Sequence, residues 1–180
     1  MKMALREEIL AKRNNLPLEE QKRLSEIICA NLIQRPNFIK AKCIAFYLAK
    51  GSEVDLRFAI EKAIEDGKDV LVPITNDHIE MVLFESFERL KPGRFGISEP
   101  IEKVEGPPPD VIIVPGVVFG LCMHRIGYGK GYYDRYLKTT NAYRIGVCYD
   151  FQLLDRLPSH NFDEPMDEII TEKRIIVKKF

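Results

Sequence analysis

Short runs of apolar residues constrain the fold of this chain more than any other feature of its sequence. Each run has the length of a strand, and in the clearest of them apolar residues occupy nearly every position. A strand of this kind is buried on both faces, which is typical of a parallel sheet covered by helices. The predicted strands cover residues 43–49, 69–74, 81–84, 110–115, 144–149 and 168–173.

Between these runs, apolar residues recur with helical spacing. The stripe from Leu24 to Leu32 predicts one helix, which should end before Pro36. Asp55 could cap another helix, which should stop at Gly67. Further helices are predicted over residues 3–14 and 131–138. The alternation of helices with buried strands indicates an α/β fold with a mostly parallel sheet flanked by helices.

The composition excludes several classes of protein. The chain has 180 residues, with 27 Lys plus Arg against 27 Asp plus Glu, so a broad nucleic-acid surface or a polybasic membrane binder is not expected. The longest apolar stretch, residues 111–121, is about half of the ~20 residues that a membrane span needs. Four scattered cysteines without a CxxC pair are typical of buried thiols in a reducing compartment. We therefore expect a single domain over residues 1–180, a cytoplasmic monomer without nucleic-acid or membrane partners.

In a parallel α/β fold, ligands bind beyond the carboxyl ends of the strands. This rule selects three loops, at residues 50–53, 116–134 and 150–152. The second loop contains Arg125-Ile126-Gly127-Tyr128-Gly129-Lys130-Gly131-Tyr132-Tyr133-Asp134. Its glycine amides, the start of a helix, Lys130 and Arg125 together predict a site for a phosphate group. The alternative is a glycine-rich turn that carries a surface lysine.

Two familiar nucleotide motifs do not fit this loop. No Ser or Thr follows Lys130, although a Walker A loop requires one. The dinucleotide fingerprint GxGxxG fails as well, because Tyr132 stands where the third glycine belongs. The sequence therefore predicts the chemistry of the ligand, a phosphate, but not its identity.

Aromatic and acidic residues accompany the glycines. Tyr128 and Tyr132 flank the loop and could either stack on a flat ligand or pack locally, whereas Tyr133 shares a helical face with core residues. Asp134 falls in the predicted first helical turn, where it could compensate the helix dipole or bind Mg²⁺ beside a phosphate. A second carboxylate for the ion could come from the acidic run 163–168.

Cations also occur near the start of the chain. Lys2 and Arg6 are four residues apart and so project from one face of the first predicted helix, where the sequence alone favours a solubilising terminus. The three histidines have no partner at metal-ligand spacing, and no Ser or Cys stands on a recognisable nucleophile elbow. Covalent catalysis is therefore not expected.

Taken together, these motifs resemble the 5-formyltetrahydrofolate cyclo-ligase family, also called 5,10-methenyltetrahydrofolate synthetases. The resemblance runs nearly end to end, and RIGYGKGYYD at residues 125–134 is its most specific piece. The other matching segments are residues 2–6 (KxxLR), 12–13, 51–54, 95–100, 107–116, 165–167 and 171–172. The resemblance implies a NagB/RpiA/CoA-transferase-like α/β sandwich. It also implies an ATP- and Mg²⁺-dependent conversion of 5-formyltetrahydrofolate to 5,10-methenyltetrahydrofolate, with release of ADP and phosphate.

The resemblance further implies the residues of the site. For ATP these are Lys2, Met3, Ala4, Leu5, Arg6, Arg125, Ile126, Gly127, Tyr128, Gly129, Lys130, Gly131, Tyr132 and Tyr133. For the folate they are Leu48, Glu53, Tyr128, Gly129, Lys130, Gly131 and Tyr132, and for the metal Asp134 and Asp167. Lys130 and Arg125 would be catalytic, because phosphoryl transfer needs mostly positioning and charge neutralisation.

Two other functions remain open. A phosphosugar isomerase or deaminase could bind phosphate in the glycine loop, but it would need a general base that no motif identifies. A catalytically silent relative could use the cleft as a binding module. The joint presence of Arg6, Lys130, Asp134 and Asp167 argues against the second alternative.

Overall fold

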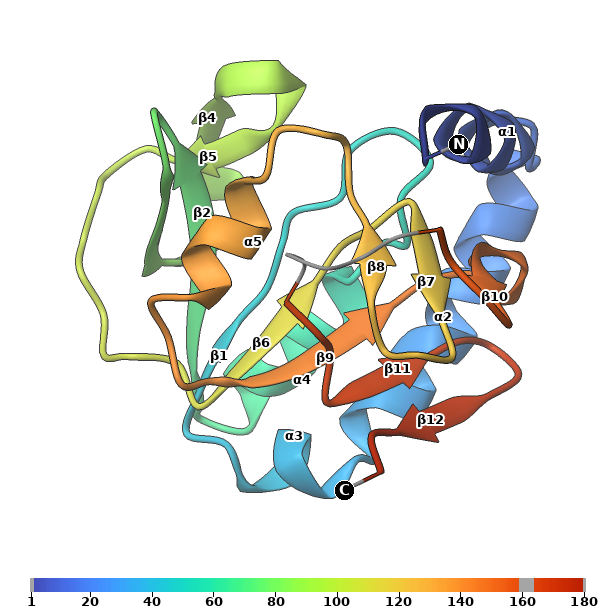
Figure 1. Ribbon diagram of the computed structural model, residues 1–180. Coiled ribbons are helices and arrows are strands. Elements are labelled where there is room, and N and C mark those ends of the chain that lie inside the picture. The colour runs from blue at the N-terminus through green and yellow to red at the C-terminus, as the bar shows by residue number, and fades with distance from the viewer. Residues whose placement is uncertain (1, 159–163, 180) are drawn as a thin grey trace.

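Seven strands form one mixed sheet at the centre of the molecule (Figure 1). In spatial order they are β12 (Ile175–Val177), β11 (Glu168–Ile170), β9 (Tyr143–Val147), β6 (Val111–Val114), β1 (Cys43–Ala45), β2 (Asp69–Thr75) and β3 (Ile79–Leu83). This computed structural model describes residues 2–158 and 164–179. The five inner strands pair in parallel, and the edge strands β3 and β12 are antiparallel to their neighbours.

Helices cover both faces of this sheet (Figure 1). On one face lie α2 (Leu18–Ile33), α3 (Pro36–Lys40) and α4 (Arg57–Glu65), and on the other lies α5 (Tyr132–Leu137). Successive side chains of β6 alternate between the two faces of the sheet. Ile113 packs in the core beneath α2 and α4, whereas Ile112 and Val114 pack in the core beside α5. The strands are apolar at every position because they are buried on both faces.

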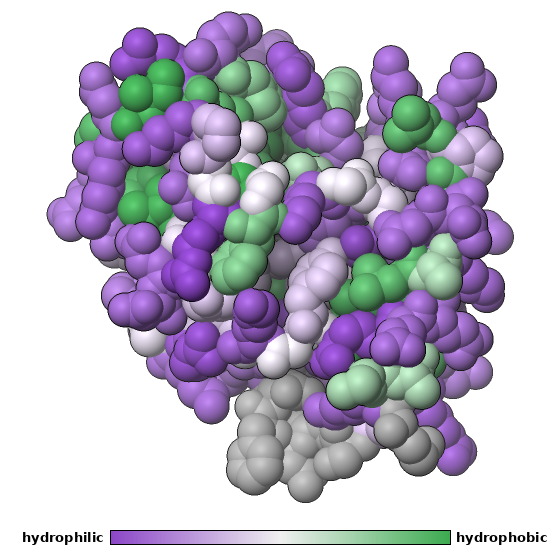
Figure 2. Space-filling model, turned by 90° about the horizontal axis from the view of Figure 1, so that it is seen from above, coloured by the Kyte–Doolittle hydropathy of each residue, from purple (hydrophilic) through white to green (hydrophobic). Residues whose placement is uncertain are grey.

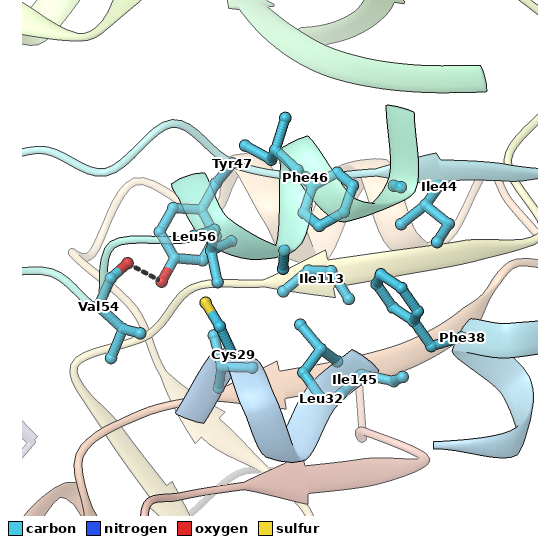
Figure 3. Close-up of a cluster of buried hydrophobic side chains, with 14 of the residues drawn as sticks. Cys29, Leu32, Phe38, Ile44, Phe46, Tyr47, Val54, Leu56, Ile113 and Ile145 are labelled. Atoms are coloured by element: carbon cyan, nitrogen blue, oxygen red, sulfur yellow. Dashed lines mark hydrogen bonds between the residues drawn. The ribbon is translucent and has the colours of Figure 1, made fainter. Parts of the chain in front are cut away.

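The core between the sheet and α2 contains several of the largest fully buried side chains, among them Phe38, Phe46 and Tyr149. Figure 3 shows Leu32 and Cys29 of α2 with Phe38 of α3 beside the strand residues Ile113 and Ile145. The last part of this core lies beyond β1, where the Tyr47 hydroxyl donates a hydrogen bond of 2.8 Å to the carbonyl of Val54. The core therefore also supports the segment that follows β1.

Smaller elements surround the carboxyl end of the sheet. The strands β4 (Leu90–Pro92) and β5 (Ser98–Pro100) form a hairpin, and β10 (Leu153–Leu154), β7 (Val118–Gly120) and β8 (Arg125–Ile126) form a second sheet. The short 3-10 helices are η1 (Phe87–Arg89), η2 (Arg94–Gly96) and η3 (Asp150–Gln152). The first helix, α1 (Lys2–Asn14), packs on the second sheet through a separate apolar cluster that includes Ile9, Val118 and Ile126.

The strand order reverses between β1 and β6. The chain passes from β1 to β2 on one side and later returns to β6 on the other side of β1. In open α/β sheets the crevice beyond such a switch point is the usual place for a ligand. The segments after β1 and β6 are therefore the first candidates for a site.

The predicted α/β class with its mostly parallel sheet is confirmed, with local differences. The strand predicted over residues 43–49 ends at Ala45. Pro36 does not only end a helix but also begins α3, because proline fits the first turn, where its missing N–H has no helical partner. Cys29, Cys43 and Cys148 are buried as expected, but Cys122 is exposed.

The described residues contain no helix that is both long enough and apolar enough to cross a membrane.

Candidate active site

A cavity of about 540 Å³ opens beyond the carboxyl ends of β1 and β6. Figure 2 looks onto this end of the molecule, where hydrophilic side chains cover most of the surface and paler residues surround a hollow near its centre. The lining includes Lys2 and Arg6 of α1, Tyr47, Leu48, Lys50 and Glu53 after β1, Pro73, Thr75 and Ile79 of β2 and β3, Phe95 and Ile97 near η2, and Pro115 with residues 125–134 after β6. The cavity thus occupies the crevice that the strand order selects.

Charge is distributed unevenly around this cavity. The charged members of its lining are Lys2, Arg6, Lys50, Arg125 and Lys130, against Glu53 and Asp134. Low-dielectric walls with an excess of one sign concentrate the field on a bound ion. The cavity therefore suits an anionic ligand.

The glycine loop has a backbone shape that other residues would disfavour. Gly129 and Gly131 have φ angles of 100° and 71°, in the left-handed region. Arg6 of α1 donates a hydrogen bond of 2.7 Å from Nε to the carbonyl of Gly127, and its guanidinium lies 3.6 Å from the position that a Cβ on Gly129 would occupy. Arg6 of the first helix thus holds the glycine loop from a separate element of the fold.

The two cations of the loop have different surroundings. Arg125 is buried, with Nη2 3.7 Å from Oδ1 of Asp134 and its guanidinium 5.6 Å from the centre of the Tyr133 ring. Lys130 is exposed, and its Nζ lies 4.5 Å from the centre of the Phe95 ring. Arg125 therefore supports the loop as well as lining the cavity, whereas Lys130 can move to meet a ligand.

Glu53 lines the cavity from the segment that follows β1. Its Oε1 accepts a hydrogen bond of 2.8 Å from the amide of Lys50, and its Oε2 accepts one of 3.0 Å from the hydroxyl of Tyr128. That hydroxyl in turn accepts a bond of 2.7 Å from Nη2 of Arg13. A carboxylate held at both oxygens presents a fixed acceptor to a ligand.

Burial affects the protonation of these groups. It raises the pKa of Glu53, and the hydrogen bond from the Lys50 amide and the charge of Arg13 oppose that rise. Burial and the nearby Glu53 carboxylate raise the pKa of Tyr128 to about 12. The Tyr128 hydroxyl consequently keeps its proton at neutral pH and can donate it to Glu53.

The predicted metal ligands lie in different surroundings. Asp134 faces the cavity and accepts a weak hydrogen bond of 3.4 Å from the amide of Glu164. Asp167 is not part of the lining, and its Oδ2 accepts a bond of 2.8 Å from the amide of Arg144. Within residues 2–158 and 164–179, no group of three or more His, Cys, Asp or Glu side chains could hold a metal ion. Asp163, in the acidic run, lies outside the described residues.

Most of the predicted site residues line this one cavity. Leu48, Glu53, Lys2, Arg6 and all ten residues of the segment 125–134 do so. Tyr133, expected in the core, both packs against it and lines the cavity.

Other predicted residues lie elsewhere. Met3 and Ala4 are exposed, and Leu5 packs against the cluster around Val117 and Val118. The third predicted loop does not line the cavity. Instead, Gln152 is buried beneath the chain that leads to the glycine loop, where its Nε2 donates to the carbonyls of Gly116 and Val117.

Sequence reasoning assigned no site role to several residues around the cavity, among them Arg13, Lys50 and Phe95. Lys50 lies in the selected loop 50–53, and Arg13 and Phe95 lie in segments that resemble the family, but nothing in those segments showed that they meet at the cavity. The positive φ of 59° at Phe95 marks the turn that brings its ring to the cavity. Such a conformation leaves no clear signal in a single sequence.

The fold and the cavity define an α/β protein with a cationic cavity, suited to a small anionic molecule, at the switch point of its sheet. The sequence model of the 5-formyltetrahydrofolate cyclo-ligase family matches residues 1–172. The chain therefore belongs to the 5-formyltetrahydrofolate cyclo-ligase family, which is a family of enzymes.

Individual relatives agree with this assignment. A probable 5-formyltetrahydrofolate cyclo-ligase of Schizosaccharomyces pombe is 31% identical over 171 residues, covering 83% of this chain and 84% of the relative. The NMR structure of Aquifex aeolicus 5,10-methenyltetrahydrofolate synthetase is 40% identical, with a TM-score of 0.88 over 98% of this chain and 92% of that one. A structure of a Mycoplasma pneumoniae 5,10-methenyltetrahydrofolate synthetase is 29% identical, with a TM-score of 0.75 over 95% of this chain and 98% of that one.

Proposed function

We propose that this chain converts 5-formyltetrahydrofolate to 5,10-methenyltetrahydrofolate, using ATP and Mg²⁺ and releasing ADP and phosphate. The observation that carries the proposal is the polarity of the cavity. The glycine loop with Arg6 and Lys130 supplies cations and backbone amides, and the segment after β1 supplies the fixed carboxylate of Glu53, which Tyr128 of the loop contacts. A reaction that transfers a phosphoryl group from ATP to a substrate with a flat ring system needs both parts.

The glycine-loop end suits the phosphates of ATP. Successive amides of a loop with left-handed residues can point at one anion, and the cations Lys2, Arg6 and Lys130 add charge. In the proposed complex, Lys130 leaves the Phe95 ring and meets the γ-phosphate, while Arg125 keeps the loop and Asp134 in place. These groups neutralise the charge that phosphoryl transfer develops.

The donor set fits a magnesium ion that is brought by the nucleotide. Mg²⁺ typically takes one or two carboxylates, completing its shell with water and phosphate oxygens, so a cluster of three acids is not needed. Asp134 would hold the ion from the cavity wall, and Asp167 could contribute only through the oxygen that does not accept the Arg144 amide. When bound, the ion would neutralise phosphate charge.

The opposite end suits the folate ring system. Glu53 can accept hydrogen bonds from ring N–H groups, and Leu48 offers an apolar contact. The rings of Phe95 and Tyr132 lie 6.0 Å apart, at the border between the two ends. Aromatic side chains there can pack on a flat ligand.

The proposed chemistry requires no protein nucleophile. The formyl oxygen attacks the γ-phosphorus and ADP leaves, which turns a poor leaving group into a phosphate ester. The N10 amine then adds to the formyl carbon and loses its proton. Phosphate leaves, and the carbon joins N5 to N10. The protein contributes by aligning the formyl oxygen with the phosphate and by holding the cations in place.

One assay tests the function. Purified protein is mixed with MgATP and 5-formyltetrahydrofolate, and the near-ultraviolet absorbance of the methenyl product is followed. Lys130→Ala should lower kcat about 100-fold, the usual effect of removing one charge-stabilising group. The control is Lys138→Ala, at an exposed position just after α5. Turnover of Lys130→Ala within a few-fold of the wild type would rule out this placement of the phosphates.

A further inference from the structure

Arg13 is a buried cation that stands behind the cavity rather than in its lining. Only 4% of its surface is exposed, and it lies on α1, seven residues after Arg6. Among the described residues, no Asp or Glu forms an ion pair with it. Burying a charge costs free energy unless hydrogen bonds satisfy it, and here neutral hydroxyl groups do so.

The first of these hydroxyl groups connects Arg13 to Glu53. The Tyr128 hydroxyl accepts a hydrogen bond of 2.7 Å from Nη2 of Arg13 and donates one of 3.0 Å to Oε2 of Glu53. A donor that is itself bonded to a cation is polarised and binds a carboxylate more strongly. The cation thereby acts on the carboxylate through the tyrosine.

The second hydroxyl group belongs to Ser52, the residue before Glu53. Its Oγ accepts a bond of 2.9 Å from Nε of Arg13 and donates one of 2.6 Å to Oδ1 of Asn14. The carbonyl of Ser52 accepts a further bond of 3.0 Å from the Tyr149 hydroxyl. Arg13 therefore holds the side chain of the residue before Glu53 directly, and it reaches the Glu53 carboxylate through Tyr128.

We propose that Arg13 is a positioning residue for the folate: through Tyr128 and Ser52 it fixes the Glu53 carboxylate in the orientation that accepts hydrogen bonds from the substrate ring. This inference rests on the proposed function, in which Glu53 binds the folate. Because Arg6 of the same helix holds Gly127 at the phosphate end, α1 sets the two ends of the cavity relative to one another.

The network also affects the pKa of Glu53. The titratable or charged groups that face it are Arg13, Lys50, Tyr47, Tyr128 and Tyr133. Arg13 and the Tyr128 hydroxyl both lower the pKa of Glu53 against the effect of burial. Removing either group should raise that pKa, so the acidic limb of kcat/KM for the folate should move to higher pH.

Two single variants and their combination test the inference. Tyr128→Phe keeps the ring and removes the hydroxyl, and Arg13→Gln removes the cation from behind the cavity. Each should raise the KM for 5-formyltetrahydrofolate about tenfold, the effect of losing a hydrogen bond to a charged group. The KM for ATP should change less, although Tyr128 belongs to the glycine loop, because the bonds removed lead to Glu53. The effect of the double variant should be smaller than the sum of the two single effects, because Arg13 and Tyr128 act through one network.

The matched controls are Tyr136→Phe on α5, outside the lining, and Arg23→Gln, at an exposed position of α2. Both should leave the two KM values unchanged. A melting curve of each variant shows whether it is folded. If Arg13→Gln does not fold, Tyr128→Phe still decides the question through its KM values and pH profile.

The outcomes separate the two proposals. A wild-type protein that forms no methenyl product refutes the proposed function. If the wild type is active but the variants change neither KM value, or raise both equally, the positioning role of Arg13 is refuted and the proposed function is not. Additive effects in the double variant would also refute it, because they would mean that Arg13 and Tyr128 act separately.

Discussion

The segment that follows β1 and the glycine loop that follows β6 face each other across the cavity, but they are held in different ways. The first is fixed by its own side chains and by the core, through the bonds from Tyr47 to Val54 and from Lys50 to Glu53. The glycine loop is shaped by left-handed backbone angles, and Arg6 holds it from another element. Arg13 of α1 also bonds to Ser52 of the first wall. The wall proposed for the ring is nevertheless preformed in part by bonds within its own segment, whereas the glycine loop is held by α1.

This difference matters because a preformed wall loses little conformational entropy when a ligand binds. A loop of glycines loses more, and outside contacts must hold it. Changes in the first wall should therefore affect stability and ring binding. Changes in the second should affect nucleotide binding first.

The largest expected effect concerns the contact between α1 and the glycine loop. Arg6→Gln removes a charged donor to the Gly127 carbonyl and a cation from the cavity, so the KM for ATP should rise about 10- to 100-fold. The KM for the folate should stay the same. Steady-state kinetics with each substrate varied in turn measures both values. Lys12→Gln, at an exposed position of the same helix, is the control. An equal rise in both KM values in Arg6→Gln would contradict the difference between the two walls.

A smaller effect is expected at two glycines, one in each wall. Gly51 and Gly129 have φ angles of 59° and 100°, so alanine at either position should lower the free energy of unfolding by about 1–2 kcal/mol. Only Gly129→Ala should also raise the KM for ATP, because a Cβ on Gly51 would meet no atom within 4 Å. Urea unfolding and kinetics measure the two effects. The same KM for ATP in both variants would show that the left-handed loop is not needed for the nucleotide.

The smallest effect is a pH dependence of stability. Burial raises the pKa of Glu53 above its ordinary value of 4.5, so the folded state favours the neutral carboxyl group. The contribution of Glu53 to stability is complete below the unfolded pKa and is lost as the pH rises through the folded pKa. Relative to Glu53→Gln, the wild type should lose about 1.4 kcal/mol for each unit of the pKa shift.

Urea unfolding of both proteins between pH 4 and pH 8 measures this difference. Glu7→Gln, at an exposed position of α1, is the control. A gap between wild type and Glu53→Gln that stays constant or widens in favour of the wild type with rising pH would contradict the sign.

The parallel sheet could be predicted because burial on both faces leaves a direct mark on the sequence. Ile112 and Ile113 belong to different cores, and both must be apolar. The extent of β1 could not be predicted, because Phe46, Tyr47 and Leu48 are also buried although they lie beyond the strand. An apolar run indicates that a segment is buried, but it does not show whether the segment also pairs with a neighbouring strand.

Some residues of the site could likewise be predicted from the sequence, and others could not. The glycine loop is local, so its residues reveal it without knowledge of the fold. Arg13 could not be connected to it, because its partners Ser52 and Tyr128 lie 39 and 115 residues away. Lys2 and Arg6 became candidates through the family resemblance, since their helix alone suggested a solubilising terminus.

The attachment of α1 has a consequence for how the protein folds. The bonds of Arg6 and Arg13 to the glycine loop span 121 and 115 residues of sequence. Closing such long loops is entropically costly, and contacts of high sequence separation form slowly. During synthesis α1 emerges before any of these partners exists, so we expect it to dock after the central sheet has assembled. A helix made before the sheet would then complete the fold after it, and folding intermediates would contain a formed sheet without the proposed nucleotide site.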